Sequence, residues 1–227
     1  MKRVFMTVGI VLAVLFALSG FRGEAVNNSF AERFTVNGKS KQEGESGAYN
    51  FDRPHSFIGF KVKHNGLIEV PGFFRDFKGT ANYDAGDPMK STVEFTAKTA
   101  SVDTGVAPRD NHLKTPDFFD VEKFPELSFK STRIEKKGKN WIMIGDFTMK
   151  GVTKSISFPF QIVGFLPGGE RSGPRMGITA ETTINRRDYG VNYDAKLPTG
   201  LLAVDDNVKV VLQIEAVVPK AAPAKTE

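Results

Sequence analysis

The stretch I-G-F-K-V-K at residues 58–63 places an apolar side chain at every second position, with glycine or lysine between them. Successive side chains of an extended strand point to opposite faces, so Ile58, Phe60 and Val62 share one face. The other face carries Lys61 and Lys63. A strand with one dry and one wet face is typical of antiparallel sheets, because strands of parallel sheets read as continuous apolar runs.

The same alternation recurs along the chain. Further examples lie at residues 93–97, 127–129, 156–162, 176–184 and 208–216, and residues 69–83 and 141–149 complete a set of about eight strands. Turn-forming glycine, proline and asparagine separate them at residues 84–88, 136–140, 167–170 and 197–200. The pattern predicts an all-β domain. It fits a closed eight-stranded antiparallel barrel with room for a ligand, and it fits a two-sheet sandwich equally well.

Phenylalanine dominates the aromatic residues, with twenty against one tryptophan and four tyrosines. Many of these phenylalanines fall on the apolar face of a predicted strand. They either fill the core or, with methionine, line a cavity suited to a long hydrocarbon, since each buried methylene contributes about 0.8 kcal/mol.

The two ends of the chain differ from this central part. A basic start, an apolar run from Val4 to Leu18 and small residues at Ser19 and Gly20 predict a secretory signal peptide over residues 1–20, cleaved rather than kept as an anchor. Residues 21–47 read as a flexible leader, residues 48–218 as the domain, and residues 219–227 as a flexible tail. We therefore expect a protein secreted through an N-terminal signal peptide.

Charge and cysteine content exclude several classes. Removing Lys2 and Arg3 with the signal peptide leaves 29 of the 31 basic residues against 26 acidic ones, which is too mild an excess for a nucleic-acid partner. The chain has no cysteine, so it can carry neither a disulfide nor a cysteine-linked lipid anchor. It also lacks a G-x-S-x-G motif and a glycine-rich phosphate loop.

Residues 101–120 interrupt the strand pattern and gather Arg109, His112 and the pair Phe118-Phe119. Loops on a rigid scaffold often carry function. The segment begins with an aspartic-protease-like triplet, Asp103-Thr-Gly105, but that mechanism needs two carboxylates sharing a proton, and the triplet occurs once. A turn capped by Asp103 is the favoured interpretation.

Three histidines, His55, His64 and His112, could together hold zinc for a metal-dependent hydrolase. Their spacing is uninformative, and hydrogen-bonded structural histidines are the favoured interpretation. Arg109, Arg186 and Arg187 are candidates to bind a phosphate or carboxylate, because the guanidinium fork matches such oxygens. The alternative is a structural ion pair with Asp110 or Asp188.

Several segments, taken in order, resemble the YceI-like family of secreted lipid-binding proteins. They are residues 52–64 (DRPHSFIGFKVKH), 70–79 (VPGFFRDFKG), 101–105 (SVDTG), 109–113 (RDNHL), 116–120 (PDFFD), 124–125 (FP), 151–154 (GVTK) and 184–190 (INRRDYG). The order and spacing span nearly all of residues 49–218, which makes the resemblance specific. Mild departures are Tyr189, where phenylalanine is common, and residues 201–206.

The resemblance implies an extended lipocalin-like barrel with a short helical or loop segment near residues 106–120. It implies a non-catalytic protein that holds a polyisoprenoid or similar long-chain amphiphile, usually in a bacterial periplasm, with no cofactor or metal. By pattern, the ligand would lie against Phe60, Val62, Phe95, Phe129, Met143, Phe158, Phe160, Met176, Ile178, Val210 and Leu212. Arg109, His112 and Arg186 would meet its head group, and Phe118 and Phe119 would cover one end. A homodimer and transient membrane contact for lipid exchange stay open.

Overall fold

The structure is a computed structural model that describes residues 43–170 and 172–220. The predicted signal peptide, most of the leader and the end of the tail lie outside the described residues. The strands are β1 (Gly47–Phe51), β2 (Phe57–His64), β3 (Ile68–Phe74), β4 (Phe77–Tyr83), β5 (Thr92–Lys98), β6 (Val102–Asp103), β7 (Glu126–Lys137), β8 (Asn140–Met149), β9 (Val152–Leu166), β10 (Arg175–Asn185) and β11 (Val204–Val217).

Helical segments are short. The described residues form one α-helix, α1 (Ala107–Leu113). They also form four 3-10 turns, which are η2 (Arg53–His55), η3 (Pro88–Lys90), η4 (Thr99–Ser101) and η5 (Arg186–Tyr189). Within residues 43–170 and 172–220, no helix has the length and apolar character needed to span a membrane.

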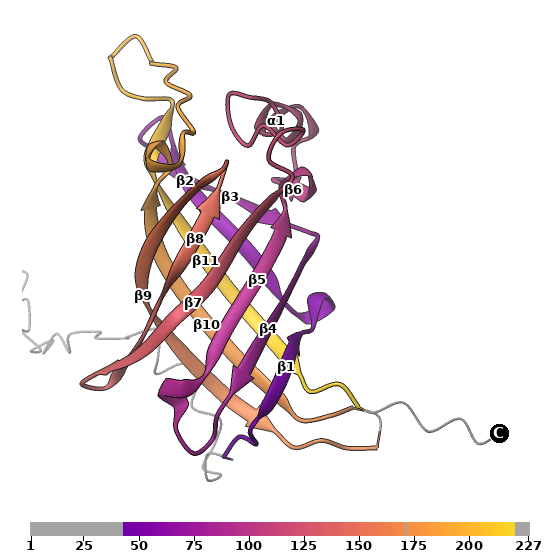
Figure 1. Cartoon of the computed structure of the whole chain (residues 1–227). Coiled ribbons are helices and arrows are strands. Elements are labelled where there is room, and N and C mark those ends of the chain that lie inside the picture. Colours follow the sequence, from indigo (N-terminus) through magenta and orange to yellow (C-terminus); the bar gives the residue numbers. More distant parts are fainter. Residues whose placement is uncertain (1–42, 171, 221–227) are drawn as a thin grey trace, which may run out of the picture. The chain divides into compact units, whose positions relative to one another are not determined.

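Eight strands close into an antiparallel barrel (Figure 1). Hydrogen bonds run from β1 through β4, β5, β7, β8, β9, β10 and β11 and then back from β11 to β1. Closure of this ring excludes the two-sheet sandwich and confirms the predicted all-β, eight-stranded antiparallel barrel with a short helix near residues 106–120. In a closed ring each strand of the barrel has a partner on both sides along at least part of its length.

One side of the barrel wall is broken twice. β1 and β2 lie end to end along β11, with Phe51 opposite Ala216 and Phe57 opposite Gln213, and η2 forms the break between them. The Ser56 hydroxyl bridges the break, because it donates to the backbone oxygen of Glu215 (3.0 Å) and accepts from its backbone nitrogen (2.9 Å).

The second break corrects a sequence prediction. Residues 69–83 were expected to form one strand, but the chain changes partners between β3 and β4. The backbone N–H groups of Arg75 and Asp76 bind the carbonyl and hydroxyl oxygens of Ser101 instead of a neighbouring strand. β3 then pairs with β2 and β6, whereas β4 pairs with β1 and β5.

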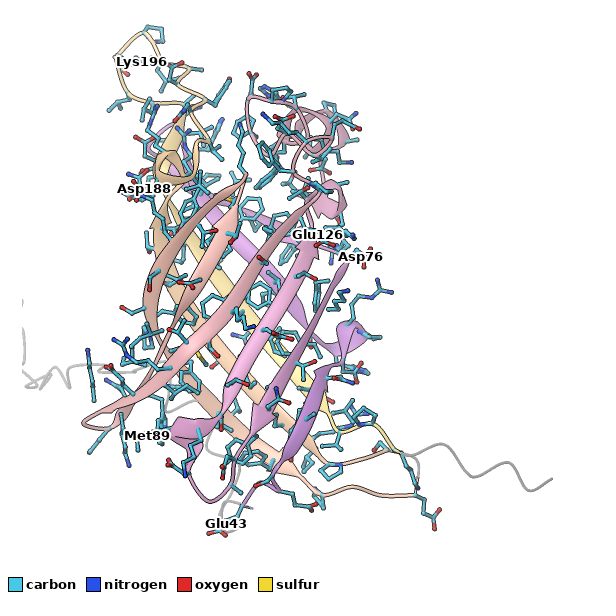
Figure 2. The ribbon with its side chains drawn as sticks, viewed as in Figure 1. Glu43, Asp76, Met89, Glu126, Asp188 and Lys196 are labelled. Carbon is cyan, nitrogen blue, oxygen red and sulfur yellow. The ribbon has the colours of Figure 1, made fainter. Side chains whose placement is uncertain are left out.

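These breaks divide the barrel into two parts. In the packed half, β1 and β4 complete the ring. In the lid half, β2 continues the wall along β11, β3 pairs with β2, and β6 pairs with β3. Residues 104–125, which we call the lid, cross the end of the barrel with α1 (Figure 1). Figure 2 shows the loop around Lys196 beyond the same end as α1, and Met89 near the opposite end.

Phenylalanine rings fill the packed half. The rings of Phe95 and Phe129 stack with centroids 5.8 Å apart, and the ring of Phe129 on β7 lies 5.4 Å from that of Phe158 on β9. The far end is closed by Tyr49, which is fully buried and donates its hydroxyl hydrogen to the backbone oxygen of Glu45 (2.8 Å). Burial raises the pKa of the Tyr49 phenol above its usual value.

Candidate functional site: an apolar cavity beneath a lid

A cavity of about 300 Å³ lies in the lid half. Strands supply most of its wall: Ile58, Phe60 and Val62 from β2, Val70 and Phe74 from β3, Phe147 and Met149 from β8, Ile184 from β10, and Val208 and Val210 from β11. The alternation seen in the sequence explains this wall, because every second residue of each strand faces the interior. The cavity is therefore bounded mainly by hydrocarbon.

The lid covers the cavity with two adjacent phenylalanines. Phe118 is buried and packs against Tyr193, with ring centroids 4.8 Å apart. Phe119 points its ring at Phe74 of β3, at 5.4 Å and in an edge-to-face arrangement. Lys150, in the β8–β9 turn, donates to the backbone oxygen of Pro116 (2.6 Å) and so ties the lid to the opposite wall. The predicted position of both phenylalanines over one end of the barrel agrees with this geometry.

Polar side chains gather where the cavity meets the lid. They are His64, Thr104, Arg109, His112, Arg186 and Tyr193, and no aspartate or glutamate lines the cavity within the described chain. Lys63 also borders the cavity, but Val62 faces inward, so strand alternation places the Lys63 side chain on the outer face. The polar part of the cavity thus carries cationic and neutral groups.

Arg186 is a structural anchor. Its side chain is only 4% exposed, and its guanidinium donates to the backbone oxygens of Val191 (2.7 Å), Val204 (3.2 Å) and Asp205 (3.0 Å). It also forms an ion pair with Asp206 at 2.7 Å. Burial lowers the pKa of this guanidinium from its usual value. The partner is Asp206 rather than the anticipated Asp188, which pairs with Lys154 instead.

Arg109 is held differently. Its Nε donates to the Thr104 hydroxyl oxygen (2.7 Å) and its Nη2 to the Thr104 backbone oxygen (2.9 Å). Asp110 accepts hydrogen bonds from the N–H and hydroxyl of Thr104, so it fixes the residue that holds Arg109 without pairing with Arg109 itself. The guanidinium is positioned by neutral oxygens, and within the described residues no carboxylate lies within ion-pair distance of it.

His112 belongs to the aromatic lining of the lid. Its ring meets Phe118 and Tyr193 edge-on, at 5.1 and 5.2 Å, and its Nε2 lies 2.8 Å from the Asp117 carboxylate. Of the predicted ligand contacts, those at this cavity are Phe60, Val62, Phe95, Arg109, His112, Phe118, Phe119, Arg186 and Val210.

The other predicted contacts lie in the packed half. Phe129, Met143, Phe158, Phe160, Met176, Ile178 and Leu212 line three small voids of about 20–30 Å³ each. Phe95 borders the main cavity and two of these voids, so it stands at the boundary between the halves. The sequence pattern identified inward-facing residues but could not tell which of them face open space.

Sequence reasoning missed part of the lining. Ile58, Ile184 and Val208 stand on the predicted inward faces and could have been chosen by the same alternation. Tyr193 and Val191 come from the loop between η5 and β11, where no periodic pattern marks them. Thr104 was noted only as part of the D-T-G triplet.

That triplet is a turn. Asp103 accepts from the Gly105 backbone N–H (2.8 Å), and Gly105 has a φ of 77°, which favours glycine. Arg75 lies 2.8 Å from the same carboxylate, and its hydrogen bond lowers the pKa of Asp103. An ionised, arginine-paired carboxylate does not suit the shared proton of an aspartic protease.

The three histidines do not form one metal site. His64 and His112 border the cavity, whereas His55 lies at η2, where it groups with Asp52 and Glu215. There, the Nη1 of Arg175 donates to Asp52 (2.7 Å) and to Glu215, so a guanidinium already occupies the position between the carboxylates. Asp52, Arg175 and Glu215 therefore form an ion-pair cluster at the β1–β2 break.

Comparisons with known proteins agree with the fold and the segment order. The family described as the YceI-like domain matches residues 49–216. The UPF0312 protein of Photorhabdus laumondii is 38% identical over 149 residues, covering 64% of this chain and 77% of its own, and the YceI protein of Escherichia coli O17:K52:H18 is 33% identical over 175 residues, covering 76% and 87%.

Solved structures show the same barrel. A Campylobacter jejuni YceI protein superposes with a TM-score of 0.60 at 29% identity, over 74% of this chain and 96% of its own. A polyisoprenoid-binding domain from Saccharophagus degradans superposes with a TM-score of 0.55 at 15% identity, over 75% and 98%, and this similarity concerns the fold alone. The match of the family model to residues 49–216, together with the closed barrel and its lid, shows that this chain belongs to the YceI-like family.

Proposed function

We propose that this protein reversibly binds a long-chain amphiphilic lipid of the isoprenoid type and carries or stores it in the periplasm without catalysing a reaction. The observation that carries the proposal is the cavity of about 300 Å³, whose strand wall is hydrocarbon and whose polar groups gather at one end. Ligand pockets of about 300–1,000 Å³ with few, convergent polar groups are typical binding sites.

The division of polar and apolar surface gives the ligand an orientation. Its tail would lie against β2, β8 and β11, and its head group would lie near Arg109 and His112 at the lid. A tail longer than the cavity would extend toward the packed half, where the small voids share Phe95 and Val210 with the main cavity. Affinity would come mainly from apolar burial, less the cost of ordering the tail.

Family membership supports the proposal, since the structurally similar domain from Saccharophagus degradans is described as polyisoprenoid-binding. The periplasmic location rests on the signal-peptide pattern of residues 1–20.

Exchange with a membrane would occur at the lid end. Leu67, Ile68 and Leu201 are 79%, 67% and 58% exposed, and a hydrogen bond from Asn65 N–H to the Ala203 oxygen (2.9 Å) holds their two loops together. Exposed apolar side chains beside the mouth of an apolar cavity suit brief insertion into a bilayer surface. Flotation with phospholipid vesicles should show binding that Leu67→Ser with Leu201→Ser reduces, and an undiminished signal would remove this part of the proposal.

Native mass spectrometry of the purified protein, followed by extraction into organic solvent, tests lipid binding itself. We expect a co-purified amphiphile, or displacement of an apolar fluorescent probe by a long-chain prenyl lipid. If no lipid is extracted and prenyl lipids leave the probe in place, the proposed function is wrong.

A further inference from the structure

We propose that the barrel wall has a lateral gate between β9 and β10, through which the tail of a bound lipid passes sideways into the cavity. This inference rests on the proposed function and adds the route of the ligand to it. β9 and β10 pair from Arg175 opposite Leu166 to Ala180 opposite Phe160. Both strands continue beyond that point toward the lid, but among the residues that the structure describes no hydrogen-bonded pair joins them there.

The sequence offers a reason for the end of this pairing. Pro159, the next residue of β9, has no N–H group to donate. Proline is found in sheets mainly on edges and at bulges. We define the seam as residues 152–159 of β9 together with residues 181–185 of β10. At the seam the wall is held by side chains and not by a ladder of backbone hydrogen bonds.

Two side-chain contacts from η5 span the seam. Tyr189 of η5 is only 2% exposed, and its ring packs edge-to-face on Phe147 of β8 at 5.3 Å. Lys154 of β9 lies opposite Phe147 in the β8–β9 ladder, so its side chain starts on the inner face of the wall, and its ammonium lies 3.4 Å from Asp188 of η5. The side chains of this ion pair are 44% and 54% exposed.

η5 is fixed more firmly to one side of the seam than to the other. On the β11 side, Arg186 donates to the backbone oxygens of Val204 and Asp205, and Arg187 binds the Asp206 carboxylate at 2.7 Å. On the β9 side there are only the ring contact and the exposed ion pair just described, and exposed ion pairs contribute little to stability. Opening of the seam therefore separates β9 from η5 and leaves η5 attached to β11.

Open space lies behind the seam. A void of about 20 Å³ is bordered by Ile156 and Phe158 of β9 and by Thr182 and Ile184 of β10. Ile184 also borders the main cavity of about 300 Å³. A tail that enters at the seam reaches the cavity without being threaded end-on past the lid, and no hydrogen bond of a strand ladder has to break.

The seam begins at the lid end of the barrel. Val152, its first residue on β9, follows the β8–β9 turn in which Lys150 binds the Pro116 oxygen of the lid. Asp188 lies at the same end as the loop around Lys196 (Figure 2). The lid and the seam therefore form a continuous opening, in which the head group passes the lid while the tail passes the seam.

Cross-linking the seam tests this route. The chain has no cysteine, so Lys154→Cys with Asp188→Cys creates a single pair of thiols that a short, reducible bismaleimide can bridge. The bridge should slow both uptake and release of a pyrene-labelled long-chain prenyl alcohol by at least about tenfold in stopped-flow exchange with vesicles, and reduction should restore both rates. Since both rates fall together, the Kd should stay within about twofold of that before bridging.

Lys98→Cys with Glu126→Cys is the matched control. These residues also form an exposed lysine–carboxylate pair, but they lie opposite each other in the β5–β7 ladder, and Figure 2 shows Glu126 on the other side of the barrel from Asp188. The same bridge at this position should leave both rates unchanged. An alcohol of two isoprene units is short enough for the main cavity and should exchange equally fast with and without the seam bridge.

Asp188→Asn removes the ion pair without changing a buried side chain. Release of the long-chain alcohol should become about twofold to fivefold faster, which is the most that an exposed ion pair accounts for, and Glu126→Gln should have no effect. An unchanged or slower release in Asp188→Asn would contradict this closure of the seam.

The gate itself is rejected if the seam bridge leaves exchange of the long-chain alcohol unchanged. It is also rejected if the bridge slows the short and the long alcohol equally, because the bridge would then only stiffen the end of the barrel. Failure of every prenyl lipid to bind the unmodified protein would instead reject the proposed function.

Discussion

The lid half and the packed half of this barrel share β7, β8, β10 and β11 and the same alternation, yet one holds a cavity and the other is filled. In the packed half, phenylalanine rings from nearby strands meet in the interior, as Phe129 of β7 and Phe158 of β9 do at 5.4 Å. In the lid half the walls present shorter side chains such as Val62, Val208 and Ile184, and the run of paired strands from β11 through β2 and β3 ends at β6. Side-chain length and the strand breaks therefore decide where the barrel is hollow.

The largest expected effect comes from removing a phenylalanine ring, either at the boundary between the lid half and the packed half or within the packed half. Phe95→Ala and Phe160→Ala should each lower the free energy of unfolding by about 3–5 kcal/mol, because both rings are buried and would leave a cavity. Urea denaturation measures this loss.

The two variants should differ in ligand preference. Of these two residues, Phe95 alone borders both the main cavity and the small voids, so Phe95→Ala should shift binding toward longer prenyl chains. Phe160 borders only the small voids and serves as the matched control. If both variants keep the chain-length preference of the unmodified protein, Phe95 does not separate the halves.

Arg186→Gln tests the structural role assigned to this arginine. It should destabilise the protein by about 3 kcal/mol, because Asp206 and three backbone oxygens would lose a buried donor. Thermal or urea unfolding gives the value. A variant as stable as the unmodified protein would show that the guanidinium is not needed to hold the loop over residues 190–203, and would return Arg186 to the set of head-group contacts.

Phe119→Ala should weaken the lid more than the fold. The ring is partly buried against Phe74, so we expect a loss of about 1–2 kcal/mol in stability and a several-fold faster release of bound lipid. Stopped-flow release of a fluorescent lipid measures the rate. An unchanged release rate combined with lower stability would make Phe119 an ordinary core residue.

The smallest effect concerns the ion pair at the β1–β2 break. Hydrogen bonding from Arg175 holds the pKa of Asp52 below its usual value of 3.8. A carboxyl whose pKa is lower in the folded state stabilises the fold above pH 3.8, and this contribution disappears as the pH falls through the lowered pKa.

Asp52→Asn should therefore be less stable than the unmodified protein near neutral pH, and the difference should shrink in acid. Urea unfolding between pH 6 and pH 2 measures it, with Asp188→Asn, which removes a carboxyl from an exposed pair with Lys154, as a control. A difference that stays constant over this range would mean that Asp52 does not titrate as described.

Most of the fold could be predicted from the alternation of apolar and polar residues and from the turn residues, because each strand has to bury one face. They could not show that β3 and β4 are separate, since the interruption at Arg75 and Asp76 depends on Ser101, which comes from η4. They also could not divide the inward residues between a cavity and a filled core. Phe60 and Phe158 both stand on the apolar face of a strand, and only the structure shows that Phe60 lines the main cavity whereas Phe158 lines two small voids.

The candidate site was predictable where its residues lie on strands or in the quoted lid motif. Arg109 and Phe118 came from that motif. Tyr193 did not, because its loop has no periodicity and reaches the lid only through contacts made in the folded chain. The separate roles of Arg109 and Arg186 likewise depend on partners far away in sequence, such as Asp206 for Arg186.

The most direct test of this account is a crystal structure of the protein with a prenyl phosphate bound. The account predicts a tail between β2, β8 and β11 in the lid half, with the phosphate within hydrogen-bond distance of Arg109. A lipid found only in the packed half, or one whose phosphate lies at the end near Tyr49, would contradict it.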